Sequence, residues 1–258
     1  MDRRKFVGAS MLTAASFTAQ SVFSANEQLA KKELYEWREY DINFGSSQAA
    51  LHQYLEKALI PALNKQGVKQ VGAFRELSKS EPPKIYLLIP YPSFEQYLTI
   101  RENVKKDNAF IENSQAYDKI APEKAVYNRV ITSLMIAFDG LPVMKNPPDG
   151  QRIFELRTYE GYNEDAVKRK IKMFNDEEFD IFYRTGLNPV FFGEMIAGKN
   201  LPCLSYMLWF KNMEERDANW KAFGADAAWK KVSADPQYAN SVSNIIRVFL
   251  EPLAYSQV

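Results

Sequence analysis

A five-residue pattern, Glu-x-Arg-x-Tyr, occurs twice in this chain, at residues Glu36 to Tyr40 and again at residues Glu155 to Tyr159. The two copies are 119 residues apart in a chain of 258 residues. Since successive side chains of a β-strand point to opposite faces, the glutamate, arginine and tyrosine of each copy would project from one face. The opposite face would be apolar, because it carries Trp37 in the first copy and Leu156 in the second. The pattern therefore predicts two equivalent strands, each with one charged and one apolar face.

The segments around the two motif copies follow the same order of predicted elements. The evidence is hydrophobic periodicity, with apolar residues at i, i+3 and i+4 in helical segments and β-branched or aromatic runs in strands. In the first half we expect strands over residues 33–43, 68–76, 84–91 and 126–138, and helices over residues 48–66 and 93–120. In the second half we expect strands over residues 152–159, 188–194, 204–210 and 245–253, and helices over residues 163–185 and 212–232.

Other residues recur at nearly the same distance along the chain. Gly67 and Gly186, which end the first predicted helix of each half, are 119 residues apart. Tyr86 and Tyr206, on the third predicted strand of each half, are 120 residues apart. An offset this constant across several elements indicates an internal tandem duplication.

Each half has the β-α-β-β-α-β order of a ferredoxin-like unit, an α+β fold whose antiparallel sheet carries both helices on one face. The other face of such a sheet is bare and needs a cover. Two units in one chain can cover each other, which predicts a single-chain α/β barrel with its helices outside. The predicted boundaries are 33–138 for the first repeat, 139–151 for a linker rich in Gly and Pro, and 152–258 for the second repeat.

The two faces of the motif strands predict which side chains line the barrel. We expect the helices to pack on the apolar side and the motif residues to face a shared interior. The candidate ligand-binding residues are these side chains and one tyrosine from the third strand of each half, namely Glu36, Arg38, Tyr40, Tyr86, Glu155, Arg157, Tyr159 and Tyr206. Each Glu-Arg pair could be a buried salt bridge that fixes the sheet register. Alternatively, the arginines and tyrosines could bind a carboxylate, phosphate or enolate.

Cysteine and histidine each occur once, as Cys203 and His52. These counts exclude an intrachain disulfide, a thiolate metal cluster and a multi-histidine site, so no metal site is predicted. Cys203 lies in an apolar run and is predicted to be a buried, unreactive thiol. The formal net charge of +1 does not favour nucleic acid or an anionic membrane as a partner. The charged residues from Lys168 to Glu178 are predicted to form a solvated helix face.

The first 25 residues have the composition of an export signal. Arg3 and Arg4 precede an uncharged stretch, Val7 to Ala19, that is rich in Ala, Ser and Thr. This stretch is too short and too polar for a transmembrane helix, and it resembles a bacterial twin-arginine signal. A basic tail is the alternative. The signal interpretation predicts a periplasmic or otherwise extracytoplasmic protein, without stable membrane insertion once the signal is removed.

Several motifs together resemble those of one protein family. They are the Phe-Glu-Leu-Arg-Thr-Tyr strand at residues 154–159, its partner at residues 35–40, Trp220, Trp229 and the Asp235-Pro236-x-Tyr238 stretch. On these residues the chain resembles a bacterial NIPSNAP-family protein of the dimeric α/β-barrel superfamily. The resemblance implies a single-chain version of a barrel that other members of the superfamily build from two subunits. It implies no settled chemistry.

Two functions are compatible with these observations. The first is binding of a small, partly anionic organic ligand in the barrel interior, by a monomer or homodimer and without a cofactor. The second is a cofactor-independent oxygenase or isomerase, of a kind that the superfamily also contains. Its general base would be Glu36 or Glu155 with a raised pKa, or a tyrosine activated by arginine. A haem would need His52 as its axial ligand, although the position of His52 on the first helix is more typical of a surface residue.

Overall fold

The computed structural model describes residues 32–78 and 81–258, so the export signal predicted at residues 1–25 lies outside the described residues. The elements of the first half are β1 (Leu34–Ile42), α2 (Ala49–Tyr54), η1 (Leu55–Leu59), α3 (Ile60–Lys65), β2 (Gly72–Glu76), β3 (Lys84–Tyr91), α4 (Phe94–Lys106), α5 (Asn108–Asp118), η2 (Pro122–Lys124) and β4 (Tyr127–Ala137). Those of the second half are β5 (Ile153–Glu160), α6 (Glu164–Met173), η3 (Phe174–Glu178), α7 (Phe179–Arg184), β6 (Asn188–Ala197), β7 (Cys203–Phe210), α8 (Met213–Ala225), α9 (Ala227–Ser233), η4 (Pro236–Tyr238) and β8 (Asn244–Pro252).

The first long helix of each half contains a π-helical turn at the same place in the repeat. These turns, η1 and η3, begin at Leu55 and Phe174, again 119 residues apart. Pro61 is the second residue of α3, which begins directly after η1, so its missing N–H falls close to where the hydrogen-bond register of the helix changes. The helix predicted over residues 48–66 therefore continues through the proline.

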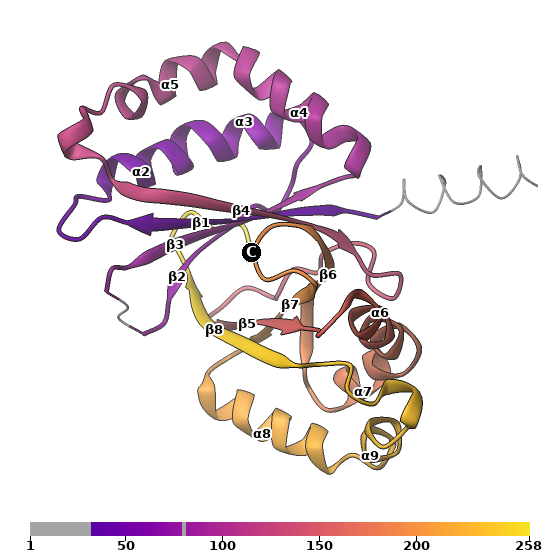
Figure 1. Ribbon diagram of the computed structural model, residues 1–258. Helices are drawn as coiled ribbons and strands as arrows, with labels where there is room; N and C mark the ends of the chain where they lie inside the picture. The colour runs from indigo at the N-terminus through magenta and orange to yellow at the C-terminus, as the bar shows by residue number, and fades with distance from the viewer. Residues whose placement is uncertain (1–31, 79–80) are drawn as a thin grey trace, which may run out of the picture.

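The eight strands form a closed antiparallel barrel in the order β1-β3-β2-β8-β5-β7-β6-β4. The two halves join at two places, where β2 pairs with β8 and β4 pairs with β6. In Figure 1, α2 to α5 cover one side of the barrel and α6 to α9 cover the opposite side. The predicted α+β fold, two ferredoxin-like repeats that form a single-chain barrel, is confirmed.

The barrel interior is filled by apolar side chains from both halves. Tyr35 and Trp37 of β1 lie there with Phe154 and Leu156 of β5. Two further apolar clusters lie between the barrel and the helices, one in each half. Tyr40 packs in the first of these clusters, and Tyr159 and Tyr206 pack in the second.

The predicted assignment of the two strand faces is therefore wrong. The motif side chains point toward the helices, and of the eight candidate residues Tyr86 alone packs inside the barrel. The physical reason is that the closed sheet surrounds the interior on all sides, so the interior favours large apolar side chains. The helix layers, in contrast, supply polar partners and have rims through which a long arginine can reach water.

One segment predicted to be solvated is partly buried. Lys170 of α6 is 5 % exposed and Glu178 of η3 is 2 % exposed, and the two side chains form an ion pair. The positions 119 residues earlier are Leu51 and Leu59, which are buried in the helix layer of the first half. The second half thus has a buried ion pair where the first half has two leucines.

Candidate functional site

The first motif copy joins β1 to helix α4. The Glu36 carboxylate is 1 % exposed and accepts hydrogen bonds from Arg38 Nε at 2.7 Å and from Tyr91 Oη at 2.9 Å. Arg101 Nη1 of α4 lies 3.6 Å from the same carboxylate. Burial alone would raise the pKa of Glu36, but the Arg38 guanidinium and the Tyr91 hydroxyl hold it below its ordinary value. Glu36 is thus an ionised partner of arginine and a weak base.

The second motif copy joins β5 to helix α8. The fully buried Glu155 carboxylate accepts from Arg157 Nη1 at 3.0 Å and from Trp220 Nε1 at 2.8 Å. Arg216 binds it through two nitrogens, both at 2.9 Å. The Arg157 guanidinium also lies over the Trp220 ring, 4.2 Å from its centroid. The Glu and Arg of each motif copy therefore form a buried salt bridge, as the first interpretation predicts, and each pair also links a strand to the helix that covers it.

The candidate tyrosines have no activated hydroxyl. Tyr206 Oη donates to Tyr159 Oη at 2.8 Å under the helices, and Tyr86 Oη donates to Glu76 Oε1 at 2.5 Å. Burial raises the pKa of Tyr40, Tyr159, Tyr206 and Tyr86 above the ordinary tyrosine value. All four hydroxyls are therefore protonated at neutral pH.

Tyr86 and Tyr206 are not equivalent residues. In the strand ladders Leu87 is opposite Arg38 and Tyr206 is opposite Arg157, so the counterpart of Tyr206 is Leu87. The distance of 120 residues between the two tyrosines differs by one from the offset of the repeat. A shift of one residue moves a strand side chain to the other face of the sheet, which explains why Tyr86 lies inside the barrel and Tyr206 outside it.

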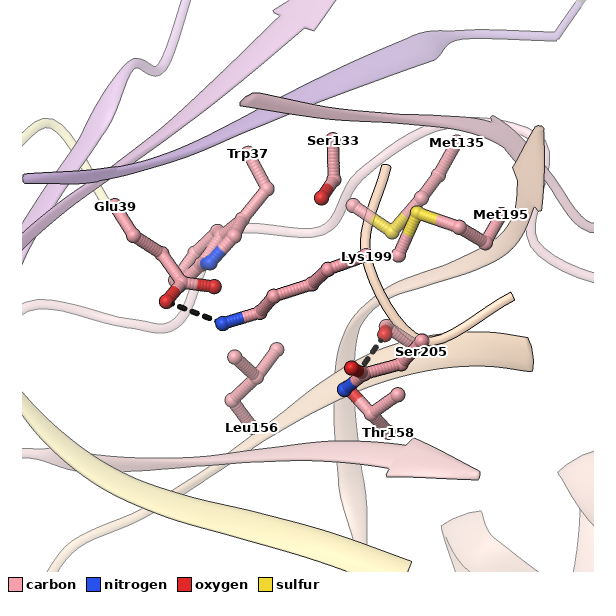
Figure 2. Close-up of a pocket in the computed structure, with 10 residues that line it drawn as sticks. Trp37, Glu39, Ser133, Met135, Leu156, Thr158, Met195, Lys199 and Ser205 are labelled. Carbon is pink, nitrogen blue, oxygen red and sulfur yellow. Dashed lines mark hydrogen bonds and ion pairs between the residues drawn. The ribbon is translucent and has the colours of Figure 1, made fainter. Parts of the chain in front are cut away.

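A small cavity opens into the barrel beside the loop between β6 and β7 (Figure 2). Its volume is about 30 Å³, which is enough for a water molecule. Both halves of the chain contribute side chains to it. The lining residues are Trp37, Glu39, Ser133, Met135, Leu156, Thr158, Met195, Lys199, Asn200 and Ser205.

The polar lining of this cavity combines a lysine, a carboxylate, an indole N–H, an amide and hydroxyl groups. Lys199 Nζ donates to Glu39 Oε2 at 2.6 Å, and the Lys199 side chain is 42 % exposed (Figure 2). The hydroxyls of Thr158 and Ser205 share a hydrogen bond of 2.7 Å. Trp37 Nε1 is buried and has no acceptor within the described part of the chain. Since a buried indole N–H normally finds an acceptor, this group is available to a ligand.

Sequence reasoning did not select these cavity residues, although a signal for two of them is present. Glu39 and Thr158 occupy the second variable position of the two motif copies, and that position faces the barrel. Lys199 lies in a loop, where strand periodicity carries no information. Its neighbours Gly198 and Asn200 both have positive φ angles, of 141° and 65°, which is a turn signal and not a site signal.

The remaining reactive residues have structural partners. His52 Nδ1 is 2.8 Å from Tyr255 Oη, and the ring is half-buried, so burial lowers its pKa. Cys203 is a buried thiol, as predicted, and burial together with Glu160 raises its pKa to about 11. Within residues 32–78 and 81–258 no group of three or more His, Cys, Asp or Glu side chains is placed to hold a metal ion. No helix in these ranges has the length and apolar character needed to cross a membrane.

Solved structures share this fold across most of the chain. A Lactobacillus acidophilus protein provisionally assigned as a monooxygenase is 11% identical, with a TM-score of 0.56 over 86% of this chain and 94% of its own. A Fusobacterium nucleatum protein with the same provisional assignment is 14% identical, with a TM-score of 0.52 over 86% of this chain and 93% of its own. These similarities support the fold and do not extend to function.

A third similar structure covers a smaller share of the chain. It is a NIPSNAP family protein from Agrobacterium tumefaciens, 16% identical, which covers 44% of this chain and 96% of its own with a TM-score of 0.38. No curated protein matches the chain significantly. The family model NIPSNAP matches residues 154–257, which begin in the second motif strand and end one residue before the C-terminus. Through this second half, the chain matches the NIPSNAP family, as the resemblance of its motifs predicts.

Proposed function

We propose that this protein binds a small organic molecule with a carboxylate or similar anionic group at the mouth of its barrel. The proposal rests on the N–H of Trp37, which is buried, faces the cavity and has no acceptor in the described part of the chain. Lys199 lines the same cavity and supplies a positive charge. A ligand carboxylate can accept from both groups, while Met135 and Leu156 contact its apolar part.

Entry of such a ligand requires the Lys199 side chain to move. The cavity of about 30 Å³ is far smaller than the roughly 300 Å³ at which organic ligand pockets begin. Lys199 is the movable part of its wall, because the side chain is 42 % exposed and lies on a loop. Because the Glu39 side chain is only 7 % exposed, this movement leaves a buried carboxylate without its partner, and contacts with the ligand have to offset that cost.

The alternative function, a cofactor-independent oxygenase or isomerase, has weaker support. Two structures of similar fold carry provisional monooxygenase assignments, but sequence identities of 14% and 11% support a shared fold and not a shared activity. The reaction needs a base whose pKa lies near the working pH. The pKa of Glu36 is held low, and burial raises the pKa of each candidate tyrosine. Glu36 and the candidate tyrosines are therefore poor bases at neutral pH, so we favour binding.

A ligand screen with two variants tests the binding proposal. Small carboxylates that raise the Tm of the wild-type protein should bind Lys199→Ala and Trp37→Phe at least tenfold more weakly. The reason is that each variant removes a hydrogen bond to a charged group, worth about 1.5–3 kcal/mol. Trp37→Phe keeps an aromatic ring inside the barrel and removes the N–H. Lys168→Ala, at an exposed lysine of α6, is the matched control and should retain full affinity. Equal affinity in all four proteins would refute the proposal.

We also propose that the chain is exported. The basis is the arginine pair, Arg3 and Arg4, ahead of the uncharged stretch from Val7 to Ala19. Residues 1–25 fused to a reporter that is active only outside the cytoplasm should give activity, and replacement of both arginines by lysine should abolish it. Equal reporter activity from the two fusions would contradict a twin-arginine signal.

A further inference from the structure

We propose that the second half carries an additional binding site, for a phosphate group, formed by Arg157, Arg216 and Arg247. These arginines come from β5, α8 and β8 and lie on the helix-facing side of the sheet. The site is separate from the barrel mouth, because Trp37 and the other cavity residues of β1 and β5 point to the opposite face. The inference therefore does not depend on the proposed function.

One buried carboxylate serves two of the three arginines. Glu155 accepts one hydrogen bond from Arg157 and two from Arg216. Arg216 has a second anionic partner, because its Nη1 donates at 2.8 Å to Asp217, which is exposed. Arg157 has none, and its Nε is buried without an acceptor in the part of the chain that the structure describes. A guanidinium with a buried, unpartnered N–H is costly, and an anion that accepts from it would remove that cost.

The third arginine is the cross-strand neighbour of the first. In the β5–β8 ladder Arg157 is directly opposite Arg247, so the two side chains leave the same face of the sheet. Like charges at such positions repel each other. Arg247 is exposed and forms no ion pair with the residues that the structure describes, so it can contact a ligand from solution. The Arg216 guanidinium lies on this face too, 5.4 Å from the ring centroid of Phe249, which is two residues along β8 from Arg247.

The first half lacks this arrangement at the equivalent positions. Arg38, the counterpart of Arg157, is opposite Thr132, so no like-charge pair forms across that ladder. The fourth residue of α4 is Tyr97, whereas the fourth residue of α8 is Arg216. Each half thus has a motif arginine and a helix arginine beside its motif glutamate, Arg38 with Arg101 and Arg157 with Arg216, while Arg247 is specific to the second half. A purely structural cluster of one glutamate and two arginines does not need Arg247, since the first half has Thr132 at that ladder position.

The number and type of donors favour a phosphate over a carboxylate. Arginine binds both anions through paired N–H groups, but a carboxylate has two oxygens and a phosphate offers three or four. Three guanidinium groups from three elements can therefore be shared by one phosphate. Two carboxylates, Glu155 and Asp217, already accompany these three cations, so the local charge excess is positive and attracts an anion.

Thermal unfolding in sodium phosphate tests the site, with sodium chloride added to hold the ionic strength constant. The Tm of the wild-type protein should rise by about 3–6 °C when phosphate reaches ten times its Kd. Arg247→Gln should weaken phosphate binding at least tenfold. The matched control is Arg129→Gln, at an exposed arginine of β4 whose side chain bonds, among the described residues, to its neighbour Asn128 alone. This variant should respond like the wild type. Lys199→Ala should also respond like the wild type, which separates this site from the barrel mouth.

A charge reversal gives an independent test. Arg247→Glu places a carboxylate opposite Arg157, so it should raise the Tm in phosphate-free buffer and abolish the response to phosphate. The proposal is overturned if Arg247→Gln and Arg129→Gln respond to phosphate equally, or if Arg247→Glu lowers the Tm without phosphate. It is also overturned if sodium acetate stabilises the wild-type protein as strongly as phosphate does at the same ionic strength.

Discussion

The buried ion pair between Lys170 and Glu178 allows a quantitative prediction, because the repeat supplies its own apolar control. Leu51 and Leu59 occupy the equivalent positions in the first half and are 0% and 4% exposed. The ammonium group of Lys170 lies 4.4 Å from the ring centroid of Phe174, so the surroundings of the pair are largely apolar. Replacement of both charged residues by leucine should therefore leave the stability unchanged or raise it, by up to about 4 kcal/mol.

Each single replacement should be destabilising, because it leaves one buried charge without its partner. The loss of stability cannot exceed the free energy needed to neutralise that charge by gain or loss of a proton. In Lys170→Leu the buried Glu178 loses its partner and can become neutral by taking up a proton. Protonation costs about 1.4 kcal/mol for each pH unit by which the solution lies above the unfolded pKa of about 4.3, which is about 3.7 kcal/mol at pH 7. In Glu178→Leu the stranded Lys170 can lose its proton instead, at a cost of about 4.6 kcal/mol from an unfolded pKa of about 10.4.

The two single variants should respond to pH in opposite directions. In Lys170→Leu the pKa of Glu178 is raised in the folded state, so the penalty is absent below about pH 4.3 and grows as the pH rises. In Glu178→Leu the pKa of Lys170 is lowered in the folded state, so the penalty is largest at low pH and shrinks as the pH approaches about 10. Urea unfolding of the wild type and the three variants between pH 5 and 9 measures these slopes. A double variant less stable than either single variant, or slopes of equal sign, would refute the reasoning.

Three further predictions concern single residues. The pKa of Glu36 is lowered on folding, so the ionised carboxylate stabilises the folded state above the unfolded pKa of about 4.3, and this stabilisation is lost in acid. In Glu36→Gln the free energy of unfolding, measured with urea, should therefore fall less steeply between pH 5 and pH 3 than in the wild type. Burial raises the pKa of the Cys203 thiol to about 11, so little thiolate is present at pH 8. Cys203 should therefore react with a disulfide reagent at that pH at least about 200-fold more slowly in the native protein than in the urea-unfolded protein. Equal rates would contradict this prediction. Gly186→Ala should lower the urea midpoint of unfolding more than Gly67→Ala does. Both glycines have a positive φ, but among the described residues only the new Cβ at position 186 would clash with a side chain, with Asn219 Nδ2 at 2.7 Å.

The sequence was sufficient to predict the elements and the barrel, because these depend on local periodicity repeated twice. The third strand predicted over residues 84–91 coincides with β3, and the strands that carry the two motif copies lie within a residue or two of β1 and β5. The repeat also constrained the topology, since one bare sheet face predicts a second unit to cover it. The export signal lies outside the described residues and stays a prediction.

The orientation of the strands was not predictable from alternation alone. Alternation shows that Glu36 and Trp37 point to opposite faces, but it does not show which face meets the helices. That choice depends on partners far away in the sequence, such as Arg101 and Arg216 on the covering helices. The buried position of Lys170 has a different origin, because its partner Glu178 is only eight residues away and reaches it across the π-helical turn formed by residues 174–178.

The repeated motif thus has two faces with different roles. Its Glu, Arg and Tyr positions hold the helices to the barrel in both halves, and this explains why the same three residue types recur. Its variable positions face the interior, where the two copies differ: Trp37 and Glu39 in the first half meet Leu156 and Thr158 in the second. Identical residues at these positions would make the interior symmetric. Because they differ, one strand gives the cavity an indole N–H and a carboxylate, and the other gives it an apolar wall and a hydroxyl. The duplication therefore preserved the structural face and left the interior face free to form a single asymmetric site.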